Sequence, residues 1–297
     1  MRNIVEIQQK LLPDLLSVMQ KRYEILRYIR LMQPIGRRSL STNLGLSERV
    51  LRSEVDFLKK QDLLNISTSG MTLTQEGTIL MRQLEEFMKE VSGLKVLEEG
   101  IKNQLQLRQV VIIPGNSDTS PWVKNEMGRA CVASMNRYLK EENIIAVTGG
   151  TTISAVAEMM APESKNRNLL FVPARGGLGE NVQNQANTIC AAMAEKTKGQ
   201  YRLLHTPDEL SNDAYQSMIA EPSIKEVLAL IKNSSMVVHS IGDAKMMAMR
   251  RKTAPENMKK IEQCKAVAEA FGYYFNSDGE VVHRVQTVGM QLADLEK

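Results

Sequence analysis

From residue 109 onward, short apolar runs alternate with segments of helical periodicity, and this alternation constrains the fold more than any other feature of the chain. Strands and helices that follow one another in this way form right-handed crossovers, which produce a parallel sheet with helices on both faces. The pattern therefore predicts a doubly wound α/β domain. The expected strands cover 110–113, 143–147, 169–172, 201–204 and 236–239, and the expected helices cover 122–140, 151–161, 183–198 and 221–233.

Glycine-rich or hydroxyl-containing segments follow three of these strands, at 148–152, 173–177 and 240–243. In parallel sheets, ligands bind beyond the carboxyl ends of the strands. Glycines let backbone N–H groups approach a phosphate, and a helix starting near Thr151 would add the positive end of its dipole. Arg175 could clamp the same phosphate. The alternative is that the glycines only permit tight turns, but their combination with Arg175 favours a phosphate-containing ligand.

Residues 34–60 carry the pattern of a helix-turn-helix, in which Gly45 permits a sharp corner and Ser47 caps the second helix. Helical spacing turns five apolar side chains inward, namely Leu46, Val50, Leu51, Val55 and Leu58. The polar side chains of the motif are then free to face a major groove. The candidate DNA contacts are Arg37, Arg38, Ser47, Arg49, Arg52 and Ser53.

The distribution of charge supports a nucleic-acid partner for this segment. Residues 21–60 hold ten Lys/Arg against four Asp/Glu, whereas residues 61–100 hold three against seven. A local basic block over such a motif is typical of phosphate contacts, although an ordinary solvated pair of helices would look similar.

The flanking segments complete a winged helix-turn-helix. A long helix is expected to begin near Pro13, and alternating residues over 63–74 predict a β-hairpin around Ser69 and Gly70. Residues 76–100 predict one linker helix, whose apolar stripe could pair with a second copy or pack on its own domain. We expect a DNA-binding domain at 1–75, a linker helix at 76–106 and an effector domain at 107–297.

Composition excludes several classes of protein. There is neither an apolar run long enough to span a membrane nor a signal peptide, so we expect a cytoplasmic protein that does not contact membranes. The three cysteines are odd in number and far apart, and the three histidines are equally scattered, which argues against a disulfide framework and a metal site. We expect no metal and no cofactor.

Long runs of the sequence resemble the SorC family of sugar-phosphate-responsive transcriptional repressors. The matching runs are 11–16, 34–41, 120–124, 147–152, 170–180, 184–191 and 269–276. The resemblance implies a repressor that binds operator DNA upstream of central glycolytic genes and responds to fructose 1,6-bisphosphate as an effector. It also implies an effector domain similar in fold to sugar-phosphate isomerases and deaminases.

The family's effector contacts carry over by position onto this sequence. The resemblance implies that one phosphate is held by Gly149, Gly150, Thr151, Thr152, Arg175 and Gln185. It further implies that Arg250 and Arg251 meet the other phosphate, Glu269 meets a sugar hydroxyl, and Gly289 lines the pocket. From the residues alone, the arginines of a helix at 244–251 would be a solvated basic face. A bisphosphate gives both basic clusters a reason to face one cavity.

The family pattern continues past Lys297 with a further strand, a Gly-Gly turn bearing a lysine, and a helix. We therefore expect the sheet of this 297-residue chain to lack a neighbouring strand, and its pocket to lack one cationic wall.

A sugar-phosphate isomerase or deaminase-like enzyme is the main alternative. Such enzymes need a positioned base, for which Glu269 and Asp243 are the candidate carboxylates. No histidine lies in the glycine loops, however, and an enzyme would leave the DNA-binding segment unexplained. A purely structural oligomer is a third option. We favour a homodimer or homotetramer that reads two operator half-sites and changes its arrangement when the effector binds.

Overall fold

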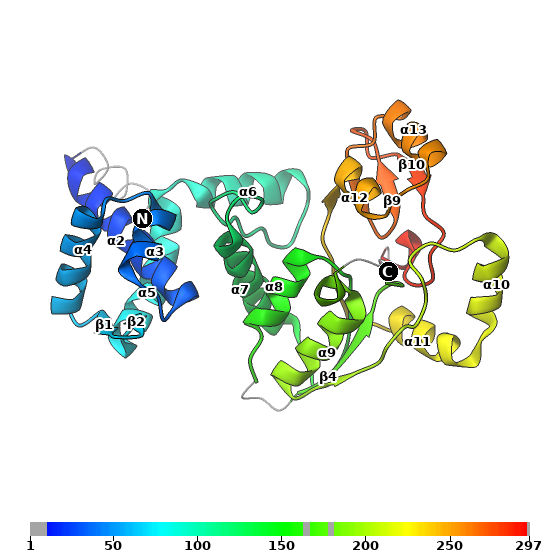
Figure 1. Cartoon of the computed structure of the whole chain (residues 1–297), viewed down its shortest axis with the longest axis horizontal. Helices are drawn as coiled ribbons and strands as arrows, with labels where there is room; N and C mark the ends of the chain where they lie inside the picture. Colours follow the sequence, from blue (N-terminus) through cyan, green and yellow to red (C-terminus); the bar gives the residue numbers. More distant parts are fainter. Residues whose placement is uncertain (1–10, 163–166, 178–180, 296–297) are drawn as a thin grey trace. The chain divides into compact units, whose positions relative to one another are not determined.

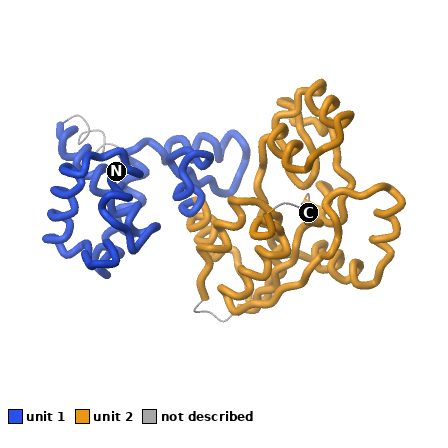
Figure 2. Tube along the Cα trace, viewed as in Figure 1, with its two compact units in different colours: residues 1–126 blue, residues 127–297 orange. Residues whose placement is uncertain are grey.

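The computed structural model describes residues 11–162, 167–177 and 181–295 (Figure 1). The chain divides into two compact units, unit 1 at Met1–Glu126 and unit 2 at Met127–Lys297 (Figure 2). Residues 178–180, which close one of the runs that resemble the SorC family, lie outside the described residues. Within the described ranges, every helix is too short or too polar to traverse a lipid bilayer.

Unit 1 contains the expected winged helix-turn-helix. Its first helices are α2 (Pro13–Met32), α3 (Arg37–Leu44) and α4 (Glu48–Lys60), and the wing is the antiparallel pair β1 (Leu64–Ser67) and β2 (Gly70–Leu73). Gly45 adopts the left-handed φ of 63° that the corner requires. The Ser47 hydroxyl accepts the Val50 N–H at 3.3 Å, which confirms the predicted helix cap.

The inward face of α4 differs from the prediction at one position. Leu51, Val55 and Leu58 are buried as expected, but Val50 is 39% exposed. The buried stripe instead includes Glu54, which follows Leu51 by three residues and binds Lys21 and Arg22 of α2. At about 100° per residue, Glu54 and Val55 lie about 60° to one side and 40° to the other side of Leu51, and Val50 falls beyond the Glu54 edge of this face.

The expected single linker helix at 76–100 is wrong. Two helices, α5 (Gln75–Val91) and α6 (Leu94–Gln104), are separated at Gly93, which has a φ of 72°. A residue in the left-handed conformation cannot continue a right-handed helix, so the chain turns there. Three apolar side chains of α6 are exposed, namely Val96, Leu97 and Ile101, whereas Leu94 is half-buried.

The parallel sheet of unit 2 confirms the predicted fold class. Its strands are β3 (Glu142–Val147), β4 (Asn168–Pro173), β5 (Gln200–Tyr201) and β6 (Met236–Val238), in the order β5-β4-β3-β6. The expected strand at 110–113 is wrong. This segment pairs with no described strand, and the Ile112 N–H donates to the Glu98 carboxylate at 2.8 Å instead. β5 is shorter than the predicted strand, because the Leu204 N–H donates to Asn187 Oδ1 at 3.0 Å and not to a neighbouring strand.

Helices cover both faces of this sheet (Figure 1). α7 (Pro121–Tyr138), α8 (Thr151–Met159) and α9 (Ala186–Thr197) pack against one face, while α11 (Pro222–Lys232), which follows α10 (Asn212–Ala220), packs against the other. Ile145 and Phe171 point to the first face, and Ala146 and Val172 to the second. Burial on both faces explains why the strands read as continuous apolar runs.

A second sheet was not predicted. β7 (Gly242–Asp243), β8 (Ala268–Ala270), β9 (Tyr273–Phe275) and β10 (Val281–Arg284) form an antiparallel sheet in the order β10-β9-β8-β7. With α12 (Ala244–Arg250) and α13 (Pro255–Gln263) they make a small antiparallel subdomain over residues 242–284. Its strands have two to four residues, too few for a clear alternating pattern in the sequence.

Candidate functional site

The register of the parallel sheet brings the glycine-containing loops together. Val147 at the end of β3 pairs with Pro173 of β4 on one side and with Val238 of β6 on the other. Consequently, residues 148–150, 174–177 and 239–241 leave the sheet side by side at its carboxyl edge. This edge is where the topology of an open parallel sheet places ligands.

The loop at 148–150 is shaped for close backbone approach. The Gly150 N–H donates to Asn184 O at 2.8 Å, and a Cβ on Gly149 would lie 2.7 Å from the same oxygen. Gly150 has a φ of 124° and directly precedes α8, whose amino end is not capped by a side chain. Thr151 and Thr152 form the first turn of this helix, so backbone amides and two hydroxyl residues gather at its positive end.

Gly289 and Gln185 also lie at this edge. Residues 287–290 run antiparallel to the end of β4, with Met290 N–H donating to Ala174 O at 2.7 Å. A Cβ on Gly289 would come within 2.6 Å of the Arg175 Cα, so glycine is needed for the close backbone contact. Gln185 precedes α9, and its Oε1 would lie 3.7 Å from a Cβ on Gly177.

Two arginines and two carboxylates form the centre of the site, which we call the four-charge cluster: Arg175, Asp208, Arg251 and Glu269. All four side chains are buried. Asp208 accepts from Arg175 Nη2 through Oδ1 and from Arg251 Nε at 2.8 Å through Oδ2. Glu269 Oε1 accepts from Arg251 Nη2 at 2.9 Å, from Arg175 Nη1 at 3.4 Å and from the Gly272 N–H at 2.6 Å. The cluster joins the parallel sheet to the small antiparallel subdomain.

Burial and the paired carboxylates act in opposite directions on the two guanidinium groups. Burial is the largest effect on Arg175 and lowers its pKa below the ordinary value, although Asp208 and Glu269 oppose the shift. Burial also acts to lower the pKa of Arg251, but Glu269 and Asp208 together raise it above the ordinary value. Arginine stays protonated in either case, so the cluster contains two positive and two negative charges.

The two consecutive arginines of the predicted site have different surroundings. The Arg251 nitrogens bind Asp208, Glu269 and the Tyr274 hydroxyl, the last at 3.0 Å. Arg250 is exposed, and within the described ranges its side chain makes no hydrogen bond or ion pair. Arg250 is therefore available to a ligand, whereas every side-chain nitrogen of Arg251 already has a partner.

Several polar atoms beside Arg175 are buried without a partner among the described residues. They are Thr148 Oγ1, Arg175 Nε, Thr206 Oγ1 and Thr287 Oγ1. Burying a hydrogen-bonding group without a partner costs free energy, so such groups usually meet a water or ligand.

Sequence reasoning missed Asp208 and Tyr274. Asp208 follows β5 just as the glycine loops follow β3 and β4. The strand-end rule therefore points to it when the rule is applied to every strand. Tyr274 lies in a three-residue strand that carries no such signal.

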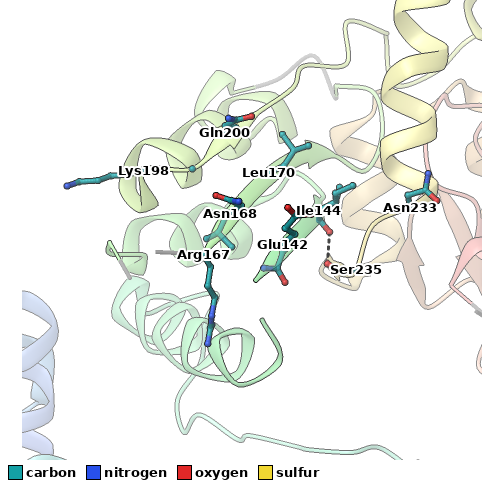
Figure 3. Close-up of a pocket in the computed structure, with 12 residues that line it drawn as sticks. Glu142, Ile144, Arg167, Asn168, Leu170, Lys198, Gln200, Asn233 and Ser235 are labelled. Atoms are coloured by element: carbon teal, nitrogen blue, oxygen red, sulfur yellow. Dashed lines mark hydrogen bonds between the residues drawn. The ribbon is translucent and has the colours of Figure 1, made fainter. Parts of the chain in front are cut away.

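A pocket of about 560 Å³ lies at the opposite, amino edge of the parallel sheet (Figure 3). Figure 3 shows the side chains of Arg167 and Lys198 pointing away from it. The Ser235 hydroxyl donates to Ile144 O at 3.2 Å. The Asn143 side chain accepts the Lys140 N–H and donates to Lys140 O, each at 2.8 Å. Because its polar groups do not converge, this pocket is a weaker candidate for a charged ligand than the carboxyl edge. The described residues also include no group of His, Cys, Asp or Glu side chains placed to hold a metal ion.

The candidate DNA contacts lie on α3 and α4 of unit 1, or directly before α4. Arg37 and Arg38 start α3 and are exposed, as are Arg49, Arg52 and Ser53 of α4. Glu54 pairs with Lys21 and Arg22 of α2, and at the surface Arg38 Nε lies 3.8 Å from the Glu48 carboxylate. The Ser47 hydroxyl oxygen accepts the Val50 N–H in capping the helix, and its own O–H remains a donor.

Comparison with known families matches both halves of the chain. Residues 18–88 match the model of the CggR N-terminal DNA binding domain, and residues 89–297 match the Sugar-bind model of a sugar-binding domain. A DNA-binding domain followed by a sugar-binding domain defines a sugar-responsive transcriptional regulator. The chain belongs to the SorC family of transcriptional regulators.

Individual relatives agree with this assignment. The chain is 65% identical to the central glycolytic genes regulator of Priestia megaterium, over 100% of this chain and 87% of the relative. It is 64% identical to the protein of the same name from Bacillus subtilis, with the same coverage. A SorC family transcriptional regulator from Enterococcus faecalis superposes with a TM-score of 0.63 and 45% identity, covering 67% of this chain and 81% of that one. These relatives are regulators, so the enzyme alternative is set aside.

Proposed function

We propose that this chain represses central glycolytic genes from operator DNA and that fructose 1,6-bisphosphate releases or remodels the complex. The observation that carries the proposal is the convergence of glycine-rich loops, an uncapped helix amino end and Arg175 at one edge of the sheet, in a chain that also carries an exposed basic helix-turn-helix. The names of two relatives with 65% and 64% identity support the choice of target genes.

The two ends of fructose 1,6-bisphosphate would use different parts of the site. One phosphate would accept from the backbone N–H groups of Gly149, Thr151 and Thr152 and from the two threonine hydroxyls, while the Gly150 N–H holds Asn184 O. The other would meet Arg250, which is exposed and therefore able to reorient toward a ligand. Glu269 would reach a sugar hydroxyl, and the unpartnered threonines beside Arg175 would supply further hydrogen bonds.

Repression would use a symmetric oligomer in the cytoplasm. A homodimer or homotetramer would place two copies of α4 on two half-sites. The exposed apolar side chains of α6 provide a surface for that assembly. Effector binding would then favour an arrangement in which the spacing of the copies no longer fits the operator.

A direct test begins with an operator selected from a random DNA pool by the unaltered chain. A panel of glycolytic phosphates is then titrated into the fluorescent complex while anisotropy and sedimentation are followed. We expect fructose 1,6-bisphosphate to change both signals at lower concentration than any monophosphate. A complex that ignores every member of the panel contradicts the proposal.

Two substitutions should separate effector binding from DNA binding. Thr152→Phe fills the space beside the amino end of α8, and Arg250→Ala removes a cationic donor. Each is expected to weaken binding of fructose 1,6-bisphosphate about tenfold to hundredfold, because hydrogen bonds to charged groups are worth about 1.5–3 kcal/mol. Operator affinity should be unchanged.

Isothermal titration calorimetry and operator anisotropy measure the two activities of these variants. Arg137→Ala, at an exposed position of unit 2, is the matched control for Arg250→Ala. A Thr152→Phe or Arg250→Ala protein that the effector still releases from DNA at the original concentration would place the ligand elsewhere.

Gly149→Ala tests the closeness of the loop packing. The new Cβ would lie 2.7 Å from Asn184 O, which already accepts the Gly150 N–H, so the loop must shift. We expect a loss of about 1–3 kcal/mol in the free energy of unfolding, as for other overpacked sites. Effector affinity should fall with it. Gly100→Ala is the control, since a Cβ there meets nothing within 4 Å. Equal stability and affinity in the Gly149→Ala protein, measured by chemical denaturation and calorimetry, would argue against this loop geometry.

A further inference from the structure

Asp208 has a position that the proposed effector contacts do not explain. It lies in the loop after β5, and its carboxylate lies between the guanidinium groups of Arg175 and Arg251. Asp208 as a whole is 7% exposed. Each of its two oxygens binds one arginine, which is how a phosphate would also bridge two guanidinium groups.

The two carboxylates of the four-charge cluster are held differently. Glu269 belongs to β8 and accepts the backbone N–H of Gly272 at 2.6 Å in addition to both arginines. Asp208 binds only the two arginines among the described residues, and it belongs to a loop rather than to a sheet. Asp208 is therefore the carboxylate that can leave at lower cost.

Five of the six guanidinium nitrogens of the cluster already have a partner, and Arg175 Nε is the exception among the described residues. All three nitrogens of Arg251 are engaged by Asp208, Tyr274 and Glu269, and both terminal nitrogens of Arg175 bind carboxylates. A phosphate that approached without displacing a carboxylate would find Arg175 Nε without a partner, but every terminal guanidinium nitrogen of the cluster already bound to another group. It would also add negative charge beside two buried carboxylates, and like charges repel strongly where water is excluded.

We propose that Asp208 is an internal anion that occupies Arg175 and Arg251 in the effector-free protein and is exchanged for an effector phosphate. This inference rests on the proposed function, because it needs a phosphorylated effector at the same site. The exchange favours a doubly charged phosphate over a weaker anion, so Asp208 sets which anions can enter. It also breaks one of the links between the parallel sheet and the small antiparallel subdomain.

The Asp208→Asn protein provides the main test. The amide has the size of the carboxylate and keeps one acceptor, but it removes the charge with which a phosphate must compete. We expect affinity for fructose 1,6-bisphosphate to rise about tenfold or more, and affinity for inorganic phosphate to rise at least as much. Calorimetry on the full chain measures both. Asp213→Asn makes the same change of charge at an exposed position of α10 and should change affinity less than about threefold.

Weaker binding of both ligands by the Asp208→Asn protein would overturn the inference. If Asp208 only orders the two arginines, Asp208→Asn will weaken both ligands, and the inference is overturned while the proposed function stands. Unchanged affinities overturn it as well. If the unaltered chain binds no sugar phosphate at all, the proposed function fails and this inference falls with it.

A measurement on the unaltered protein covers the case in which Asp208→Asn does not fold. The loop that carries Asp208 is joined to the sheet by Gly177 N–H donating to Thr206 O at 3.1 Å, and Leu210 N–H donates to Gln286 O at 2.9 Å. Departure of the carboxylate loosens this loop, so effector binding should speed amide hydrogen exchange over 205–210 and slow it over 148–154. Slower exchange in both segments would refute the exchange of anions.

Discussion

Replacing Glu126 with alanine is expected to lower the free energy of unfolding of unit 1 by about 3–5 kcal/mol. The Glu126 side chain is 2% exposed and binds Arg27 Nε at 2.8 Å and Arg30 Nη2 at 3.3 Å. Arg27 is itself buried. Removing the carboxylate leaves buried positive charge without its partner, which costs far more than the loss of a surface ion pair.

Tryptophan fluorescence during chemical denaturation measures this effect directly. Trp122 is the single tryptophan of the chain, and its ring lies 5.7 Å from the Tyr28 ring and 5.1 Å from the Arg27 guanidinium. Glu86→Ala is the control, because it removes an exposed carboxylate whose Oε1 lies 3.8 Å from Lys89 Nζ in a surface ion pair. Its effect should stay within about 0.5 kcal/mol. Similar stabilities for the Glu126→Ala and Glu86→Ala proteins would contradict the structural role of Glu126.

Reversing the charge of Arg52 is expected to abolish operator binding, with a loss of affinity of about hundredfold or more. An arginine contact to a base edge is worth about 1–3 kcal/mol, and the glutamate of Arg52→Glu would in addition repel the phosphates. Arg52 is exposed on α4, next to Ser53 and three residues from Arg49. Effector binding should be unchanged, because it depends on unit 2.

Anisotropy with the selected operator and calorimetry with fructose 1,6-bisphosphate test both halves of this prediction. Arg137→Glu makes the same change of charge at an exposed position of unit 2 and controls for the general electrostatic effect. Loss of both activities in Arg52→Glu would count against separate DNA-binding and effector-binding parts. Full operator affinity would remove α4 from the DNA interface.

Local patterns were sufficient for much of the fold. Gly45 and Ser47 mark the helix-turn-helix by backbone conformation and capping, which are properties of a few neighbouring residues. The parallel sheet was equally readable, since a strand buried on both faces must be apolar throughout. The strand at 110–113 failed because an apolar run also arises in an extended segment, where Glu98 rather than a strand accepts the Ile112 N–H.

Local sequence patterns predicted some residues of the candidate site, and family resemblance alone supplied the others. Residues 149–152 and Arg175 follow strands, so the rule of strand ends identified them without any tertiary information. Glu269, Arg250, Arg251 and Gly289 entered only through resemblance to the SorC family. Nothing in the local sequence distinguishes Arg250, which is exposed, from Arg251, whose side chain is buried in the four-charge cluster.

The sequence by itself determined the helix-turn-helix, the central strands of the parallel sheet and the order of the two domains, because periodicity, capping and turn formation depend on residues a few positions apart. Only the tertiary structure decided which charges neutralise one another. Arg175, Asp208, Arg251 and Glu269 come from four distant segments, and their contacts arise only when the small antiparallel subdomain packs on the parallel sheet. Charge pairing depends on distance in space and on exclusion of water, and neither quantity is recorded in the spacing of residues along the chain.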